Sequence, residues 1–138
     1  MAVTLSTDPA QTGWIKIHIV GDATVAGLLG EVYNPEGVLL QINRGFLYIT
    51  TPSTAAAVPL VGIGATGVSS NTILATLATN QAAGTMWNVV GMDRASEAAA
   101  TTPWGVLWPA TSYLTVTNSV AASTALVADL YLQYIRLA

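Results

Sequence analysis

The sequence predicts an all-β protein: a jelly-roll-like β-sandwich of about eight strands with an extended N-terminal arm. Two long segments alternate apolar and polar side chains with the two-residue period of half-buried strands, one around Ile15–Ile19 and one around Leu126–Tyr134. Glycine- and proline-containing turns separate further short strand-like segments at fairly even spacing. A length of 138 residues fits one domain with a core of its own.

The expected organisation is an arm at residues 1–12 and a single β-sandwich domain at residues 13–138. The residues 69–83 are ambiguous, because Asn71 could cap a short helix whereas the β-branched residues after it favour a strand. Residues 95–100 could hold one helical turn. The expected strands begin at Trp14 and then cover Ala23–Tyr33, Val38–Thr51, Val58–Ile63, Trp104–Trp108, Tyr113–Thr117 and Thr124–Leu137.

The longest expected strand, residues 38–51, follows a turn at residues 34–37, where proline and glycine occupy positions that suit a type I turn. Gly45 in its middle indicates a bulge or a bend. Pro59 places the next strand at a sheet edge or at a strand start. One face of the long strand is expected to carry Val38, Leu40, Ile42, Arg44, Phe46, Tyr48 and Thr50.

The composition combines 52% hydrophobic residues with only 8% charged residues, against a usual charged fraction of about 25%. The four cations are scattered, so the sequence predicts neither a nucleic-acid-binding stripe nor a polybasic membrane patch. No apolar run is long enough for a transmembrane helix, and no signal peptide opens the chain, which disfavours an outer-membrane barrel. Cysteine is absent, which excludes disulfides and thiolate metal sites.

The sequence indicates no catalytic, cofactor-binding or metal-binding residues. Residues 62–67 match the pattern G-x-G-x-x-G, but no helix is expected to follow, which favours a glycine-rich strand end and loop. His18 is the only histidine and is interpreted as a surface or interface residue. The acids occupy mostly turn-like contexts. The sequence therefore predicts a protein that is not an enzyme and has no cofactor.

The tryptophans admit three interpretations: core packing, a subunit interface, or a platform on which a sugar stacks. Trp104 and Trp108 are expected on one face of one strand, about 13 Å apart at the rise of a strand. The candidate interface residues are Trp14, Trp87, Trp104, Trp108 and Tyr131.

Several segments resemble the small all-β capsid accessory proteins of tailed bacteriophages, the cement or decoration proteins. The resemblance implies a jelly-roll-like subunit that oligomerises on the capsid surface and braces neighbouring capsid proteins, without catalytic residues. The segments that carry it are Gly30–Gly37, Ile42–Arg44, Tyr48–Thr51, Val61–Gly64, Gln81–Thr85 and Leu130–Arg136.

The first functional hypothesis is therefore a virion structural protein on the outer capsid surface, made in the host cytoplasm. Its expected partners are other copies of itself, with a trimer favoured over a dimer, and the phage major capsid protein, but no nucleic acid and no membrane. The arm could add a strand to a neighbour. The alternatives are a carbohydrate-binding β-sandwich for receptor binding or adhesion, and a tail or fibre subunit.

Overall fold

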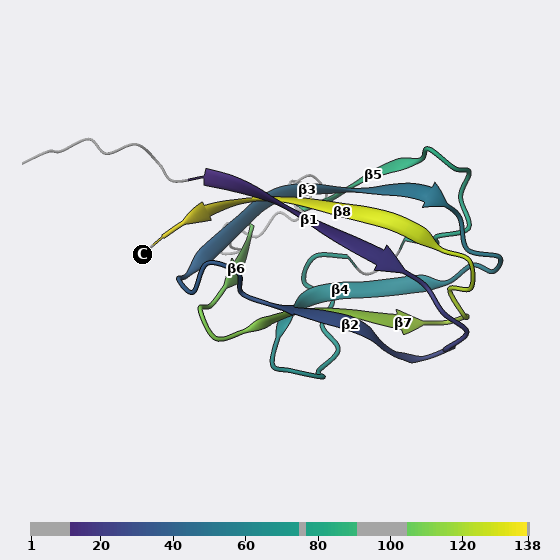
Figure 1. The fold of residues 1–138 in the computed structure, drawn as a ribbon, viewed down its shortest axis with the longest axis horizontal. Helices are drawn as coiled ribbons and strands as arrows, with labels where there is room; N and C mark the ends of the chain where they lie inside the picture. Colours follow the sequence, from purple (N-terminus) through teal and green to yellow (C-terminus); the bar gives the residue numbers. More distant parts are fainter. Residues whose placement is uncertain (1–11, 75–76, 91–104, 138) are drawn as a thin grey trace, which may run out of the picture.

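The structure is a computed structural model that describes residues 12–74, 77–90 and 105–137. These three stretches form strands, turns and irregular connections, without a helix. The all-β prediction is confirmed (Figure 1). The strands are β1 Thr12–Val20, β2 Gly27–Tyr33, β3 Leu40–Thr51, β4 Val58–Gly64, β5 Met86–Val90, β6 Val106–Trp108, β7 Tyr113–Ser119 and β8 Val127–Arg136.

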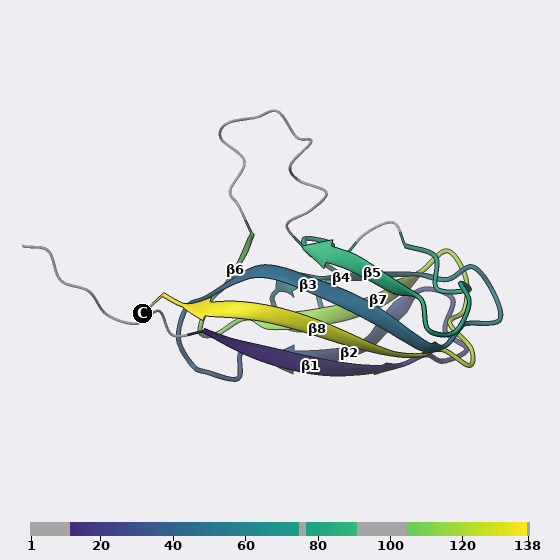
Figure 2. The same ribbon diagram turned by 90° about the horizontal axis from the view of Figure 1, so that it is seen from above.

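Two antiparallel sheets pack face to face (Figures 1 and 2). The first sheet has the order β1-β8-β3-β5, and β6 also pairs with β3. The second has the order β2-β7-β4, and an isolated bridge from Leu74 to Val61 adds a short segment beside β4. The chain crosses between the sheets after each of the first four strands, and this strand order is that of a jelly roll. The predicted sandwich of about eight strands is confirmed.

The core fills the space between the two sheets with large apolar side chains from both. Leu40, Ile42, Leu47 and Ile49 of β3 are fully covered, and Leu114 faces them from β7. Burying each such side chain stabilises the fold by roughly 1.5–3 kcal/mol. The core residues of β8 are those that alternation predicts: Ala128, Leu130, Leu132 and Tyr134.

The predicted face of β3 is wrong in its second half. The register of β3 against β8 shifts between Ile42 and Arg44, so that one extra residue lies in β3 at this point. Because side chains alternate with a period of two, the extra residue exchanges the two faces. Phe46 and Tyr48 therefore lie on the outer face, while the core receives Leu47. The irregularity expected around Gly45 does occur.

The connection between β2 and β3 crosses from one sheet to the other at the expected turn, residues 34–37. The side-chain oxygen of Asn34 accepts hydrogen bonds from the backbone N–H groups of Glu36 and Gly37. Its amide nitrogen donates to the carbonyls of Trp108 and Pro109 at 3.0 and 3.1 Å. A buried polar side chain is thereby satisfied, and the turn is joined to the connection after β6.

Several strands begin at other residues than the sequence predicts. The strand expected over residues 23–33 begins only at Gly27, because the backbone N–H of Thr24 binds the carboxylate of Asp22 and the chain bends there. The strand expected from Trp104 begins at Val106. Pro59 is the second residue of β4, the last strand in the order of its sheet, as predicted. The described part of residues 69–83 contains no helix. Residues 95–100, and the arm up to residue 11, lie outside the described residues.

Candidate interaction surface

The outer face of the β1-β8-β3-β5 sheet carries the strongest cluster of potential contact residues. The cross-strand register places Lys16, Tyr131 and Phe46 in one row across β1, β8 and β3. The adjacent row contains Trp14 and Arg44 on either side of Gln133. Directly opposed residues share a face, so these side chains all project away from the core.

Three aromatic rings join across these rows, and we call Trp14, Phe46 and Tyr131 the aromatic cluster. The rings of Phe46 and Tyr131 stack with centroids 4.8 Å apart and an interplanar angle of 19°. The ring of Trp14 lies 6.2 Å from Phe46 at a tilt of 58°. Each such pair contributes about 0.5–1.5 kcal/mol beyond burial. Trp14 nevertheless remains 48% exposed, so much of its indole is available to a partner.

Charged side chains border the aromatic cluster. The guanidinium of Arg44 lies 5.5 Å from the ring centroid of Trp14, and the Lys16 ammonium lies 6.0 Å from that of Tyr131. At exposed sites these cation–π contacts contribute about 0.5–1 kcal/mol each. The Asp129 carboxylate lies 2.7 Å from His18 Nδ1 and 3.7 Å from Lys16 Nζ. His18 is thus a surface residue, as interpreted from the sequence, and it has a carboxylate partner.

The other candidate interface residues lie elsewhere. Trp108 is 0% exposed, and its indole N–H donates to the carbonyl of Ser112 at 3.0 Å. Trp108 is therefore a core residue in the single chain, which corrects its assignment as a contact residue. Trp87 is opposite Leu47, hence on the core side of its edge strand, and is 39% exposed. Trp104 lies outside the described residues, so the expected pair with Trp108 has only one described member.

Phe46 is the member of the aromatic cluster that the candidate residues from the sequence did not include. It links Trp14 to Tyr131, whereas alternation counted from Leu40 placed it on the same face as Leu40 and Ile42. The available signal was the polar pair Asn43-Arg44 before Gly45, which interrupts the apolar alternation where the register shifts.

The motif at residues 62–67 is confirmed as a strand end and loop. The chain continues from β4 into residues 65–72, which fold over the outer face of the β2-β7-β4 sheet. The hydroxyl of Thr115 donates to the Val68 carbonyl at 3.0 Å. A side chain at Gly62 would approach Ser70 Oγ to 2.3 Å. This glycine is required by close packing of the loop and not by a phosphate group.

Glu31 holds the same loop from β2. Its carboxylate accepts a hydrogen bond of 2.6 Å from the hydroxyl of Thr66 and one of 2.8 Å from the backbone N–H of Gly67. These two hydrogen bonds, Thr66 first, lower the pKa of Glu31 below its ordinary value of 4.5. We call residues 65–72 the covering loop.

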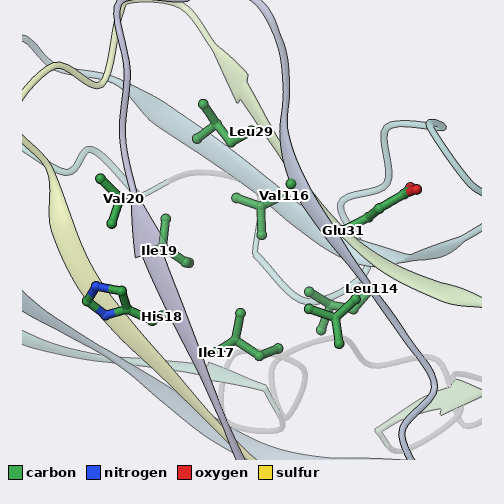
Figure 3. A pocket seen from close by; sticks show the side chains of 10 residues that line it. Ile17, His18, Ile19, Val20, Leu29, Glu31, Leu114 and Val116 are labelled. Atoms are coloured by element: carbon green, nitrogen blue, oxygen red, sulfur yellow. The ribbon is translucent and has the colours of Figure 1, made fainter.

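An apolar groove lies between the edge strands β1 and β2 (Figure 3). It has a volume of about 160 Å³. Its apolar lining consists mainly of Ile17, Ile19, Leu29, Val32, Leu114 and Val116. Within residues 12–74, 77–90 and 105–137, no three His, Cys, Asp or Glu residues gather as metal ligands. The same residues contain no helix long and apolar enough to cross a membrane.

The chain is similar in fold to a chain of a solved structure described as "Capsid of Ralstonia phage GP4". The TM-score is 0.54 with 16% sequence identity, and the likeness covers 99% of this chain and 92% of that chain. At this identity the likeness establishes the fold alone. No protein-family model and no curated protein matches the sequence.

Proposed function

We propose that this protein is a non-catalytic structural protein of a tailed-phage virion that binds the outer surface of the capsid. In this role it oligomerises and braces neighbouring major capsid subunits, as cement or decoration proteins do. The observation that carries the proposal is the likeness in fold to a chain of the Ralstonia phage GP4 capsid. Because nearly all of each chain is covered, the two chains have nearly equal lengths and share the whole sandwich.

The surface of the sandwich supports a role in assembly. Only 8% of the residues are charged, so the surface gains little protection from self-association through charge repulsion. The aromatic cluster presents a half-exposed tryptophan beside an arginine, two of the residue types that most often dominate the binding energy of protein interfaces. We assign the contact with the major capsid protein to this cluster.

Co-sedimentation tests the proposal. Capsids assembled from the major capsid protein of the same genome are mixed with the purified chain and pelleted at 50 mM and at 1 M NaCl. We expect the chain to pellet with capsids at both salt concentrations, because apolar contacts survive screening that weakens exposed ion pairs. Failure to pellet at low salt contradicts capsid binding. Release at high salt alone contradicts the apolar mode of attachment.

Carbohydrate binding is a second candidate, and the exposed face of Trp14 is the observation that favours it. An aromatic ring beside polar groups is a suitable platform for a sugar. The buried Trp108 cannot serve in this way. Titration of the chain with bacterial surface polysaccharides, followed by tryptophan fluorescence, distinguishes the two functions. Saturable quenching that Trp14→Ala abolishes, without capsid binding, supports the carbohydrate-binding alternative.

A further inference from the structure

We propose that the groove between β1 and β2 is the acceptor site for residues 1–5 of a second copy of this chain, which add a strand to β1. This inference rests on the homo-oligomer part of the proposed function and deepens it by naming the contact. Strand addition supplies backbone hydrogen bonds, and pockets for alternate side chains supply specificity.

The acceptor has two free edges. β1 ends the first sheet and β2 ends the second, so among the described strands neither has a neighbour on its outer side (Figure 2). An edge strand presents a row of backbone N–H and C=O groups that can pair with another chain. Leu29 is the extra residue of a bulge in β2, and its side chain joins the lining of the groove. The edges therefore enclose an apolar site that a strand could complete.

The size and chemistry of the groove suit aliphatic side chains. A volume near 150 Å³ lined by aliphatic groups is about enough for a benzene-sized molecule, and this groove measures about 160 Å³. Ile17 and Ile19 project toward it from β1. A strand paired with β1 would place every second side chain beside these isoleucines.

The first residues of the chain have the required alternation. Met1, Val3 and Leu5 are large and apolar, and the residues that alternate with them are small or polar: Ala2, Thr4 and Ser6. Two or three successive inward positions can therefore enter the groove while the hydroxyl side chains face solvent. Eleven residues precede the start of β1, and when extended they span at most about 40 Å. With residues 1–5 in the groove, residues 6–11 form the connector between the copies and span at most about 22 Å when extended, so the acceptor is a directly adjacent copy.

The pairing register between the arm and β1 favours an arm from a second copy over the arm of the same chain as the occupant of the groove. Residues 8–11, Asp-Pro-Ala-Gln, suit a tight turn that would return the arm along its own β1. That hairpin would pair Val3 with Lys16 and Leu5 with Trp14, both of which face outward. The apolar residues of the arm would then point away from the groove. An arm from another copy is free of this constraint.

Site-directed cross-linking tests the proposal, because the chain has no native cysteine. Copies that carry Leu5→Cys and copies that carry Leu29→Cys, with different tags, are refolded together and treated with a short bis-maleimide. The matched control pairs Leu5→Cys with Val68→Cys, a more exposed site outside the groove. We expect at least a tenfold greater yield of the cross-linked pair with Leu29→Cys. Equal yields in the two mixtures would overturn the proposal.

Two further measurements test whether the groove binds the arm of its own chain or the arm of a second copy. A single chain with both Leu5→Cys and Leu29→Cys is cross-linked at high dilution, and closure within that chain would show that the arm binds its own groove. Light scattering compares the full chain with a variant that carries Val3→Asp and Leu5→Asp. We expect an oligomer for the first and a monomer for the second, and an unchanged mass overturns the proposal. Capsids are absent from these experiments, so their failure leaves capsid binding undecided.

Discussion

The outer faces of the two sheets differ in whether another segment of the chain covers them. On the β2-β7-β4 sheet, the covering loop lies over the strands and is held by hydrogen bonds to Glu31 and Thr115. On the β1-β8-β3-β5 sheet, the described residues provide no such cover for the aromatic cluster, and the half-exposed ring of Trp14 remains available. One face has its contacts within the chain, whereas the other retains large side chains that can gain contacts from a partner.

This difference separates residues that stabilise the fold from residues that are available for binding. Under the covering loop the side chains are small or hydroxylic, since Gly62 and Thr115 allow backbone to approach backbone. On the opposite face the side chains are bulky and aromatic, which are the types enriched at interface centres. We therefore expect substitutions on the covered face to change stability, and substitutions on the uncovered face to change binding.

Among the substitutions that test this difference between the faces, Gly62→Ala is expected to cause the largest change in folding stability. The added Cβ would lie 2.6 Å from the backbone nitrogen of Thr72, so the covering loop must move or the strand must bend. Overpacking of this kind costs typically about 1–3 kcal/mol, and we expect the upper part of that range. Urea unfolding measures it. The matched control is Gly64→Ala, whose Cβ would make an ordinary contact of 3.8 Å with Ser70. Equal stabilities for the two variants would show that the loop does not press on the sheet.

Trp14→Ala tests the uncovered face. If the aromatic cluster binds the capsid, the loss of a hot-spot side chain costs about 2 kcal/mol, which is roughly a 30-fold weaker affinity. The folding free energy should fall by about 1–2.5 kcal/mol, because the substitution also removes the ring contact with Phe46 and the cation–π contact with Arg44 within the chain. Quantitative co-sedimentation and thermal melting measure the two quantities. Val68→Ala on the covering loop is the control that should retain full affinity.

The sequence was sufficient to predict the sandwich, because strand alternation and turn residues act locally. The core face of β8 and the turn at residues 34–37 follow from such local signals. Local signals could not predict the sheet face on which Phe46 lies. That face depends on where β3 shifts its register against β8, which is a property of the pairing between distant segments. The position of the covering loop could likewise not be predicted from the sequence, because the contact of Gly62 with Ser70 depends on the path of the loop. Trp108 could not be assigned to core or interface before the strand neighbours were known.

A smaller effect is expected from two threonines of β7 on the covered face. Thr115→Val removes the hydroxyl that donates to the Val68 carbonyl, and the loss of such a hydrogen bond costs about 1 kcal/mol. The buried hydroxyl of Thr117 has no hydrogen-bond partner among the described residues. Thr117→Val should therefore leave stability unchanged or raise it by up to about 1 kcal/mol. Urea unfolding of both variants gives the comparison, and a larger loss for Thr117→Val would contradict it.

The smallest expected effect concerns the pH dependence of the covering loop. Hydrogen bonds from Thr66 and Gly67 stabilise the ionised carboxylate of Glu31 and lower its pKa in the folded state below 4.5. A carboxylate with a lowered folded-state pKa contributes stability above its unfolded pKa, and loses that contribution as the pH falls through the folded-state value. Glu31→Gln cannot ionise, so its melting temperature should lie below that of the unaltered chain near neutral pH. The difference should shrink as the pH is lowered below 4.5. A thermal melting series from pH 7 to pH 3 measures this trend, and a difference that is constant across the series would show that the charge of Glu31 does not hold the loop.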